Sequence, residues 1–225
     1  MKQALSIIIP TLNEEEHLAA TLDRLPADLE VVVVDGGSRD ATAAIARGHG
    51  ASLLVTEAGR GRQMNAGARA ATGEVLLFLH ADTLLPPDFQ AEVGRCLARQ
   101  DGVAGAFRLQ FNGVGPGLAL IAWGANMRSR LWQLPYGDQA LFMERRVFDD
   151  LGGFPEVALL EDLMLVKALR KQGRIVLSNQ AVYSSARKWR QHGLLRTTLV
   201  NQLIVAGFFF GLSPQFLAKI YGVRK

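Results

Sequence analysis

The sequence predicts an α/β protein in which helices cover both faces of a mostly parallel sheet. The first observation is a set of short apolar runs, above all residues 31–34 and 75–79. Such runs are too short for helices and too unbroken for half-exposed strands, so they indicate strands buried on both faces. The second observation is that segments of helical length and periodicity separate these runs. This alternation predicts parallel strands joined by right-handed crossovers, and hence three layers in the order α/β/α.

Each predicted element is bounded by a turn or capping signal. Residues 5–9 form a β-branched strand that Pro10 closes, and Asn13 can cap the helix that follows. The glycines after residue 35 allow a tight turn at the end of the second strand. In order, the predicted elements are strand 5–9, a helix carrying Leu18, Leu22 and Leu25, strand 31–34, a helix through Ala46, strand 52–55, a helix into which residues 59–67 lead, strand 75–79, a helix after Pro87, strand 103–111, an apolar helix or loop over 118–131, strand 140–143 and a helix over 163–172.

Length and composition predict one large domain with a C-terminal appendage. The chain has 225 residues, of which 49% are hydrophobic, and can therefore bury a sizeable core. The predicted boundaries are 1–190 for the domain and 191–225 for a helical tail. Within the tail, residues 203–212 are apolar but only about half as long as a bilayer span. The tail can therefore cover the core, pair with a second copy in a homodimer, or lie in a membrane interface.

Composition also limits the compartment and the partners. Cys96 is the only cysteine, so no internal disulfide forms. The apolar run nearest the N-terminus, residues 5–9, is far shorter than the core of a signal peptide. We therefore expect a cytoplasmic protein, with peripheral contact to the inner face of the membrane as the alternative that the tail leaves open. The net charge of +4 suits phosphate-bearing ligands and anionic surfaces equally, and no nucleic-acid-binding motif is present.

Carboxylates follow two of the predicted buried strands. Asp35 ends the second strand, and His80 and Asp82 follow the strand over residues 75–79. In open α/β sheets this edge is where ligands bind, although Asp82 could also merely cap a turn. No G-x-G-x-x-G or Walker lysine loop occurs, which disfavours dehydrogenases and P-loop enzymes. Acidic groups at a phosphate site imply a bridging divalent cation, hydrogen bonds to a base or ribose, or both.

The second half of the chain adds another acidic pair. Glu161 and Asp162 lie at the start of the predicted helix over 163–172, where backbone N–H groups favour a carboxylate. Each can be a helix cap or a functional group. Asp138, in the polar turn over 135–139, is likewise either a turn residue or a ligand contact.

The ordered motifs resemble family 2 glycosyltransferases with the GT-A fold, a Rossmann-like α/β/α arrangement. The resemblance covers residues 6 to about 189. It rests on I-I-I-P-T-L-N-E-E at 7–15, V-D-G-G-S-R-D-A-T at 34–42, G-R-x-x-N-x-G at 61–67, G-E-V-L-L-F-L-H-A-D at 73–82, and G-G-F-P-E with E-D within 152–162. Within the family, the G-G-S, H-A-D, Y-G-D-Q and S-A-R-K-W segments are most similar to small transferases of arsenosugar biosynthesis or associated with radical-SAM enzymes.

The resemblance implies a set of site residues. Asp82 would bind the divalent cation, Mg²⁺ or Mn²⁺, at the sugar diphosphate, and Asp162 would be the catalytic base, with Glu161 as the neighbouring candidate. The expected donor-binding residues are Pro10, Thr11, Glu14, Asp35, Ser38, Arg62, Asn65, His80 and Asp82. The expected acceptor or diphosphate contacts are Asp138, Gln139, Arg187 and Trp189. One base and one metal fit an inverting displacement, in which the cation neutralises the leaving diphosphate.

This chain departs from the family pattern at two places. Gly36 stands where many relatives have a second aspartate, so base specificity stays open. His80 stands where relatives commonly have the first aspartate of Asp-x-Asp. It can form a hydrogen bond to the ribose, bind the metal, or only pack at the end of the strand.

Two further segments have a functional and a structural interpretation. His192 is a second conceivable metal ligand, or a surface residue. The basic segment at Arg187 resembles the family's Q-x-x-R-W without its glutamine, and can equally be a basic turn.

We therefore expect a metal-dependent glycosyltransferase that moves a sugar from a nucleotide-sugar donor to a small or lipid-linked acceptor. Two alternatives remain at the level of sequence. A nucleotidyltransferase would use a similar nucleotide-binding half to form a nucleotide sugar and release pyrophosphate. A nucleotide-binding protein with reduced catalysis is the other, suggested by Gly36 and His80.

Overall fold

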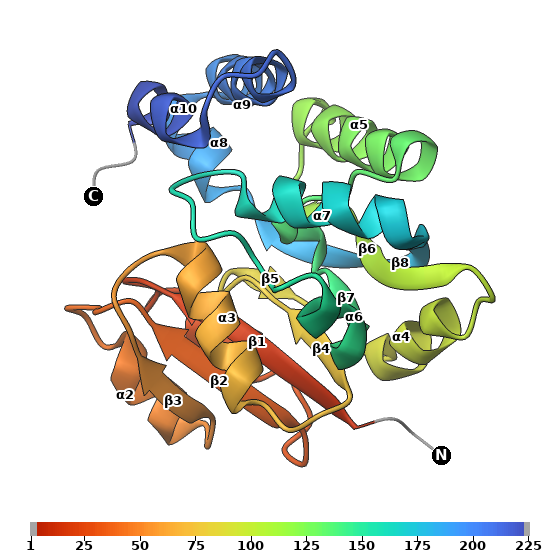
Figure 1. Ribbon diagram of the computed structural model, residues 1–225. Coiled ribbons are helices and arrows are strands. Elements are labelled where there is room, and N and C mark those ends of the chain that lie inside the picture. Colours follow the sequence, from red (N-terminus) through yellow and green to blue (C-terminus); the bar gives the residue numbers. More distant parts are fainter. Residues whose placement is uncertain (1–3, 223–225) are drawn as a thin grey trace.

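A computed structural model describes residues 4–222. It has one eight-stranded mixed sheet with the strand order β3-β2-β1-β4-β7-β6-β8-β5. Helices lie on both sides of the sheet, and a group of C-terminal helices lies at the end of the molecule farthest from β3 (Figure 1). The architecture confirms the predicted three-layer α/β fold with C-terminal helices.

The first half of the chain forms the parallel part of the sheet. β1 pairs in parallel with β2 on one side and with β4 on the other, and β2 pairs in parallel with β3. Its elements are β1 (Leu5–Thr11), α1 (Leu18–Leu22), β2 (Glu30–Asp35), α2 (Thr42–Gly48), β3 (Ser52–Val55), α3 (Arg60–Ala70) and β4 (Val75–Phe78). All four strands lie within about two residues of the predicted ranges because their apolar runs are short and sharply bounded.

The second half of the chain mixes strand directions. β7 is antiparallel to both β4 and β6, whereas β8 is parallel to β6 and antiparallel to β5. Its elements are β5 (Thr83–Leu84), α4 (Phe89–Leu97), β6 (Gly102–Asn112), α5 (Pro116–Trp132), the 3-10 turn η1 (Gly137–Gln139), β7 (Phe142–Glu144), α6 (Arg145–Asp150), α7 (Glu161–Gln172) and β8 (Arg174–Ser185). β8 was not predicted, because its polar residues interrupt the apolar alternation.

Two apolar cores lie on opposite faces of the sheet. In β1, Ile8 points to one face, where α3, α6 and α7 pack, and Ile7 and Ile9 point to the other, where α1, α2 and α4 pack. All three isoleucines are fully buried. Complete burial of such a side chain contributes about 1.5–3 kcal/mol, so this strand anchors both layers.

The chain ends in three helices that pack against the second half of the molecule. They are α8 (Arg187–His192), α9 (Leu194–Phe209) and α10 (Pro214–Tyr221). The packing is partial: Ile204 is buried and Phe208 contacts the core beneath α7, while much of α9 stays exposed. Within residues 4–222, the structure contains no helix both long and apolar enough to cross a bilayer.

Candidate active site

A pocket of about 350 Å³ opens at the carboxyl ends of β1 and β4. The start of α3, the turn η1, the start of α7 and the three C-terminal helices complete its walls. Nine of the residues predicted for the site line it: Pro10, Glu14, His80, Asp82, Asp138, Glu161, Asp162, Arg187 and Trp189. Residues far apart in sequence therefore meet at the sheet edge where α/β proteins bind ligands.

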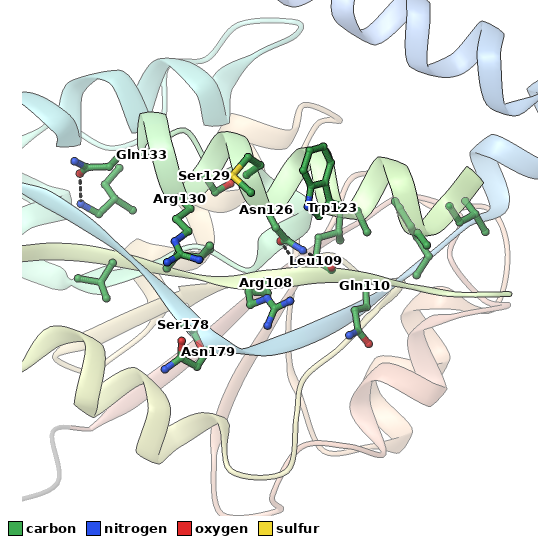
Figure 2. Close-up of a pocket in the computed structure, with 18 of the residues that line it drawn as sticks. Arg108, Leu109, Gln110, Trp123, Asn126, Ser129, Arg130, Gln133, Ser178 and Asn179 are labelled. Atoms are coloured by element: carbon green, nitrogen blue, oxygen red, sulfur yellow. Dashed lines mark hydrogen bonds between the residues drawn. The ribbon is translucent and has the colours of Figure 1, made fainter. Parts of the chain in front are cut away.

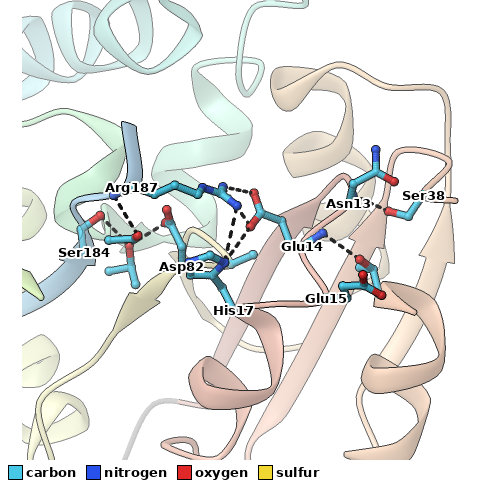
Figure 3. Close-up of polar contacts among 12 residues, drawn as sticks. Asn13, Glu14, Glu15, His17, Ser38, Asp82, Ser184 and Arg187 are labelled. Atoms are coloured by element: carbon cyan, nitrogen blue, oxygen red, sulfur yellow. Dashed lines mark hydrogen bonds and ion pairs between the residues drawn. The ribbon is translucent and has the colours of Figure 1, made fainter. Parts of the chain in front are cut away.

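An ion pair spans one side of this pocket beside Asp82. Nη2 of Arg187 lies 2.9 Å and 3.2 Å from the two carboxylate oxygens of Glu14, which joins the loop after β1 to α8. Figure 3 shows Arg187 reaching between Glu14 and Asp82. Burial lowers the pKa of Arg187, but Glu14 and the more distant Asp82 outweigh this effect and leave its pKa raised. Arg187 is therefore a fixed positive charge next to the Asp82 carboxylate.

Asp162, in the first turn of α7, is held by two backbone N–H groups. Gly137 donates to Oδ2 over 2.6 Å, and Leu163 donates to Oδ1 over 2.7 Å. Leu160, just before α7, has a φ of 69°, a conformation that is uncommon for a residue with a side chain. This bend starts α7 so that its first turn faces η1. Asp162 is not the N-cap residue, and its second backbone bond comes from another segment, so a simple capping role does not describe it.

His80 packs against the same glycine. A Cβ atom on Gly137 would lie 2.8 Å from Nε2 of His80 and 3.2 Å from Oδ2 of Asp162, so only glycine fits there. Burial, assisted by the positive charge of Arg60, lowers the pKa of His80 to about 3. The imidazole is therefore neutral near pH 7 and can accept or donate a hydrogen bond without adding charge to the site.

Arg60 is the residue of this site that sequence reasoning missed. It begins α3, lines the pocket, and lies 3.4 Å from a carboxylate oxygen of the buried Glu161. Burial lowers the pKa of Arg60, but Glu161, Asp162 and Asp82 together raise it by more. Burial and the neighbouring Asp162 raise the pKa of Glu161, against the opposing effect of Arg60. The only feature of the sequence that could have pointed to Arg60 is its place in the G-R-G-R segment over 59–62, in which Arg62 was the predicted ligand contact.

Asp138 contributes a carboxylate that is not satisfied by the protein. Its Oδ1 atom is buried and has no hydrogen-bond partner among the described residues. Burial, together with the negative charges of Asp162 and Asp82, raises the pKa of Asp138 to about 6 despite the opposing charge of Arg128. A buried acceptor without a donor is costly in free energy, and a bound donor or cation would remove that cost.

Asp35 and Ser38 lie outside this pocket, at the turn after β2. The Asp35 carboxylate accepts hydrogen bonds from the backbone N–H and the hydroxyl of Ser38, and the hydroxyl of Thr11 lies 3.5 Å from it. The Ser38 hydroxyl in turn accepts from the backbone N–H of Asn13 (Figure 3). This network ties the β1 and β2 loops together beside Pro10, at the same edge of the sheet as the pocket.

Besides Thr11, Asp35 and Ser38, the structure places four further predicted site residues away from the pocket. Gln139 is fully buried, and its side chain bonds Ser129 and the carbonyl of Phe107. Asn65 holds both the N–H and the carbonyl of Phe154 at 2.8 Å. The other two are Arg62, which pairs with Glu57 and Glu156, and His192, which is exposed at the end of α8. These four side chains lie outside the pocket, bonded to protein groups or exposed to solvent, and their predicted ligand contacts stay predictions.

A match to a family model decides the identity of the chain. The model described as "Glycosyl transferase family 2" matches residues 6–152, which is more than half of the chain. The protein belongs to glycosyl transferase family 2. The matched region includes β1 to β4, η1 and β7, and so contains Asp82, His80 and Asp138.

Curated relatives and solved structures agree with this membership of the family. A "PGL/p-HBAD biosynthesis glycosyltransferase" of Mycobacterium tuberculosis is 34% identical over 162 residues, covering 66% of this chain and 62% of the relative. An uncharacterized glycosyltransferase of the same organism is 41% identical over 80 residues, covering 35% of this chain and 37% of the relative. The chain thus spans less than two thirds of the length of these relatives.

Two solved structures share the fold. A mannosyltransferase from Pyrobaculum calidifontis, solved with GDP-Man and Mn²⁺, is 25% identical with a TM-score of 0.71, covering 91% of this chain and 63% of that one. Glucosyl-3-phosphoglycerate synthase from M. tuberculosis, solved with Mn²⁺, UDP and glucosyl-3-phosphoglycerate, is 19% identical with a TM-score of 0.60, covering 81% of this chain and 70% of that one. The second supports the fold alone.

The carboxylates of this family 2 site suit a cation that arrives with its ligand. Among residues 4–222, no group of three or more His, Cys, Asp and Glu side chains is arranged to hold a metal ion unaided. Mg²⁺ commonly binds one or two carboxylates plus substrate phosphates, keeping several waters. Asp82, which lines the same pocket as the unsatisfied oxygen of Asp138, fits that mode of binding.

Proposed function

We propose that this protein transfers a sugar from a nucleotide-sugar donor to an acceptor hydroxyl, with Mg²⁺ or Mn²⁺ and with inversion at the sugar carbon. The observation that carries the proposal is the convergence of Asp82, Asp138 and Asp162 with Arg60 in one pocket at the carboxyl edge of the sheet. The mannosyltransferase solved with GDP-Man and Mn²⁺ supports the proposed classes of donor and cation.

Asp82 is the residue proposed to hold the cation. It lies in the short segment between β4 and β5, and Thr83 donates weakly to its Oδ1 at 3.4 Å, which leaves lone pairs free. A bound divalent cation would neutralise negative charge on the leaving diphosphate. Arg187, Arg60 and Lys188 line the same pocket and can add positive charge there.

Asp162 is the residue proposed to take the proton from the acceptor hydroxyl. Two backbone N–H groups fix both oxygens, one on each, and every carboxylate oxygen still has a further lone pair. Glu161 is the weaker candidate, because its carboxylate is buried and paired with Arg60. A base fixed at one wall of the pocket, with the cation site near Asp82, is consistent with a single in-line displacement and inversion.

The similarity to arsenosugar-biosynthesis and radical-SAM-associated transferases stays a prediction from the sequence motifs. Neither the family model nor the relatives described above belong to that subgroup by name. The sugar, the base and the acceptor are therefore left as classes in this proposal.

Product analysis tests the proposal. The purified chain is incubated with radiolabelled UDP- and GDP-sugars and Mn²⁺, with and without candidate hydroxyl acceptors. Transfer predicts release of nucleoside diphosphate and labelled acceptor. Formation of nucleotide sugar and pyrophosphate from sugar phosphate and nucleoside triphosphate would identify a nucleotidyltransferase instead. Tight nucleotide binding with no turnover of any donor would identify a binding protein.

A further inference from the structure

The C-terminal helices and α5 present a large exposed apolar surface at one end of the molecule. In α9, Leu195, Leu199 and Leu203 recur every four residues and are 88%, 61% and 60% exposed. In α5, Leu120 and Trp123 are also exposed, one turn apart. Residues at these spacings share one side of a helix, so each helix carries an apolar stripe that the protein does not cover. Monomers rarely expose large contiguous apolar patches unless a partner covers them.

The helices that carry these stripes are close neighbours. A Cβ on Gly117, in the first turn of α5, would lie 2.9 Å from a methyl group of Leu194, the first residue of α9. α10 follows α9 directly and exposes Phe216 and Ile220, which are also one turn apart. Figure 1 shows α5, α9 and α10 together at the end of the molecule away from β3. We call the exposed sides of α5, α9 and α10 the apical face.

The apical face comes from the parts of the chain that contain no acidic residue. All 21 Asp and Glu residues lie before residue 163, with only 14 of the 25 Lys and Arg residues. Residues 163–225 therefore carry the other eleven basic residues and no acid, and residues 102–137 also contain no Asp or Glu. The rest of the chain is net acidic. The net charge of +4 is therefore the sum of a positive part, residues 102–137 and 163–225, and a negative remainder. We call the part of the molecule around the apical face its positive end.

A basic groove of about 740 Å³ lies beside α5 on this positive end. Arg99, Arg108, Arg130 and Arg174 line it, together with Trp123 of the apolar stripe. Figure 2 shows Arg108, Arg130 and Trp123 of this set. Arg174 lies 3.6 Å from Asp101. Among the residues that the structure describes, the other three arginines have no acidic partner within 4 Å. Free guanidinium groups next to exposed aromatic and aliphatic side chains suit phosphate headgroups above an acyl layer.

We propose that the apical face docks on an anionic lipid bilayer, with Arg108 and Arg130 of the groove at the phosphate level and the leucines of α9 in the interface. A second copy of the chain fits less well, because a two-fold contact would bring two acid-free, basic surfaces together. Trp123 and the long arginine side chains also suit a membrane interface, where an apolar body and a polar tip are both satisfied. The docking does not depend on sugar transfer.

Vesicle sedimentation of the full chain tests the docking. The probes are vesicles of phosphatidylcholine alone and vesicles of equal parts phosphatidylcholine and phosphatidylglycerol, at low and high salt. The expected result is binding to the anionic vesicles that weakens with salt, and little binding to the neutral ones. Absence of binding to the anionic vesicles overturns the proposal.

Paired variants locate the contact. Leu195→Ser with Leu199→Ser should lower the partition constant at least about tenfold, and Arg108→Gln with Arg130→Gln should lower it about fivefold for each lost charge. Val55→Ser, an exposed residue of β3, and Arg47→Gln, an exposed residue of α2, are the matched controls. All of these positions are exposed, so melting temperatures should stay near that of the unsubstituted chain.

Two outcomes besides absence of binding would overturn the proposal. One is an equal loss of vesicle binding in the controls and in the apical-face variants. The other is a dimer, detected by light scattering, that Leu195→Ser with Leu199→Ser dissociates while its binding to anionic vesicles stays unchanged.

Discussion

Among single residues, Asp162 matters most for the proposed proton transfer. The two backbone bonds that fix its carboxylate mean that asparagine is not a neutral replacement. In Asp162→Asn, the single amide oxygen could accept from Gly137 or from Leu163, and the amide NH₂ would face the other N–H. Some loss of stability, about 1–3 kcal/mol, is therefore expected from the unsatisfied donor.

Asp162→Asn should cost on the order of 10²-fold to 10⁴-fold in kcat, because it removes the proposed proton acceptor. Assays are run well below the melting temperature of the variant, so that lost stability does not imitate lost catalysis. Nucleoside diphosphate binding serves as the control and should be retained. A folded variant that keeps more than about a tenth of kcat would show that another group takes the proton.

Asp138 gives a prediction about stability and pH. Its pKa is raised to about 6 in the folded protein, so the folded state holds this proton more tightly than the unfolded state does. Below about pH 4 the carboxyl is protonated in both states, and stability is lost as the pH rises through about 6. Asp138→Asn should therefore be more stable than the unsubstituted chain at pH 8, by at most about 3 kcal/mol, and similar to it near pH 4.

Melting temperatures in EDTA check this prediction, since a bound cation would favour the ionised carboxylate. Asp149→Asn, at an exposed position of α6, controls for the loss of one negative charge. A difference between Asp138→Asn and the unsubstituted chain that is the same at pH 4 and pH 8 would mean that Asp138 is not buried as described.

At the scale of elements, Arg145, the first residue of α6, connects α6 to the end of α3 and to the turn before β4. The guanidinium of Arg145 donates to three backbone carbonyls at the end of α3 and in the turn before β4: Ala68 at 2.7 Å, Ala71 at 2.8 Å and Gly73 at 2.9 Å. The last carbonyls of a helix lack partners within it, so this side chain acts as a C-terminal cap supplied by another element.

Arg145→Ala should therefore lower the free energy of unfolding by about 3 kcal/mol, because three partly buried acceptors lose a charged donor. Arg146→Ala is the matched control, since Arg146 is the next residue and is exposed. It should change stability by no more than about 0.5 kcal/mol. Equal denaturation midpoints for the two variants would contradict the capping role.

The strands also show which elements could be predicted from the sequence and which could not. Strands β1, β2 and β4 were predictable because each contains a short apolar run of the kind found in strands buried on both faces of a sheet. β8 was missed because it carries Ser178, Asn179 and Gln180 in its middle, where the β6 pairing is irregular. Local patterns cannot report such a strand, since its partners are set by long-range pairing.

The same limit applies to the site. Asp82, Asp162 and Asp138 were found because carboxylates at element ends are visible in the sequence. The sequence did not show whether a side chain points into the pocket or into the protein interior. Arg60 lines the pocket, whereas Gln139 and Asn65 form hydrogen bonds with backbone groups inside the protein. That choice depends on segments brought together only by the fold.

At the scale of the whole molecule, each half of the chain supplies a different part of the candidate site. The parallel half supplies the β1, β2 and β4 loops with Glu14, Asp35 and Asp82, and the mixed half supplies η1 and α7 with Asp138 and Asp162. The Glu14–Arg187 pair ties the first loop to the C-terminal helices across the pocket mouth. We propose that Asp82 lets a divalent cation bind a nucleoside diphosphate between these halves.

Calorimetric titration tests that claim most directly. GDP and UDP are titrated into the unsubstituted chain and into Asp82→Asn, each in Mn²⁺ and in EDTA, with Asp88→Asn on the exposed start of α4 as the matched control. We predict that Mn²⁺ tightens binding of at least one of the two nucleotides about tenfold or more in the unsubstituted chain and in Asp88→Asn, and has little effect in Asp82→Asn. An equal effect of Mn²⁺ on the unsubstituted chain and on Asp82→Asn, or no binding of either nucleotide with Mn²⁺, would contradict the account.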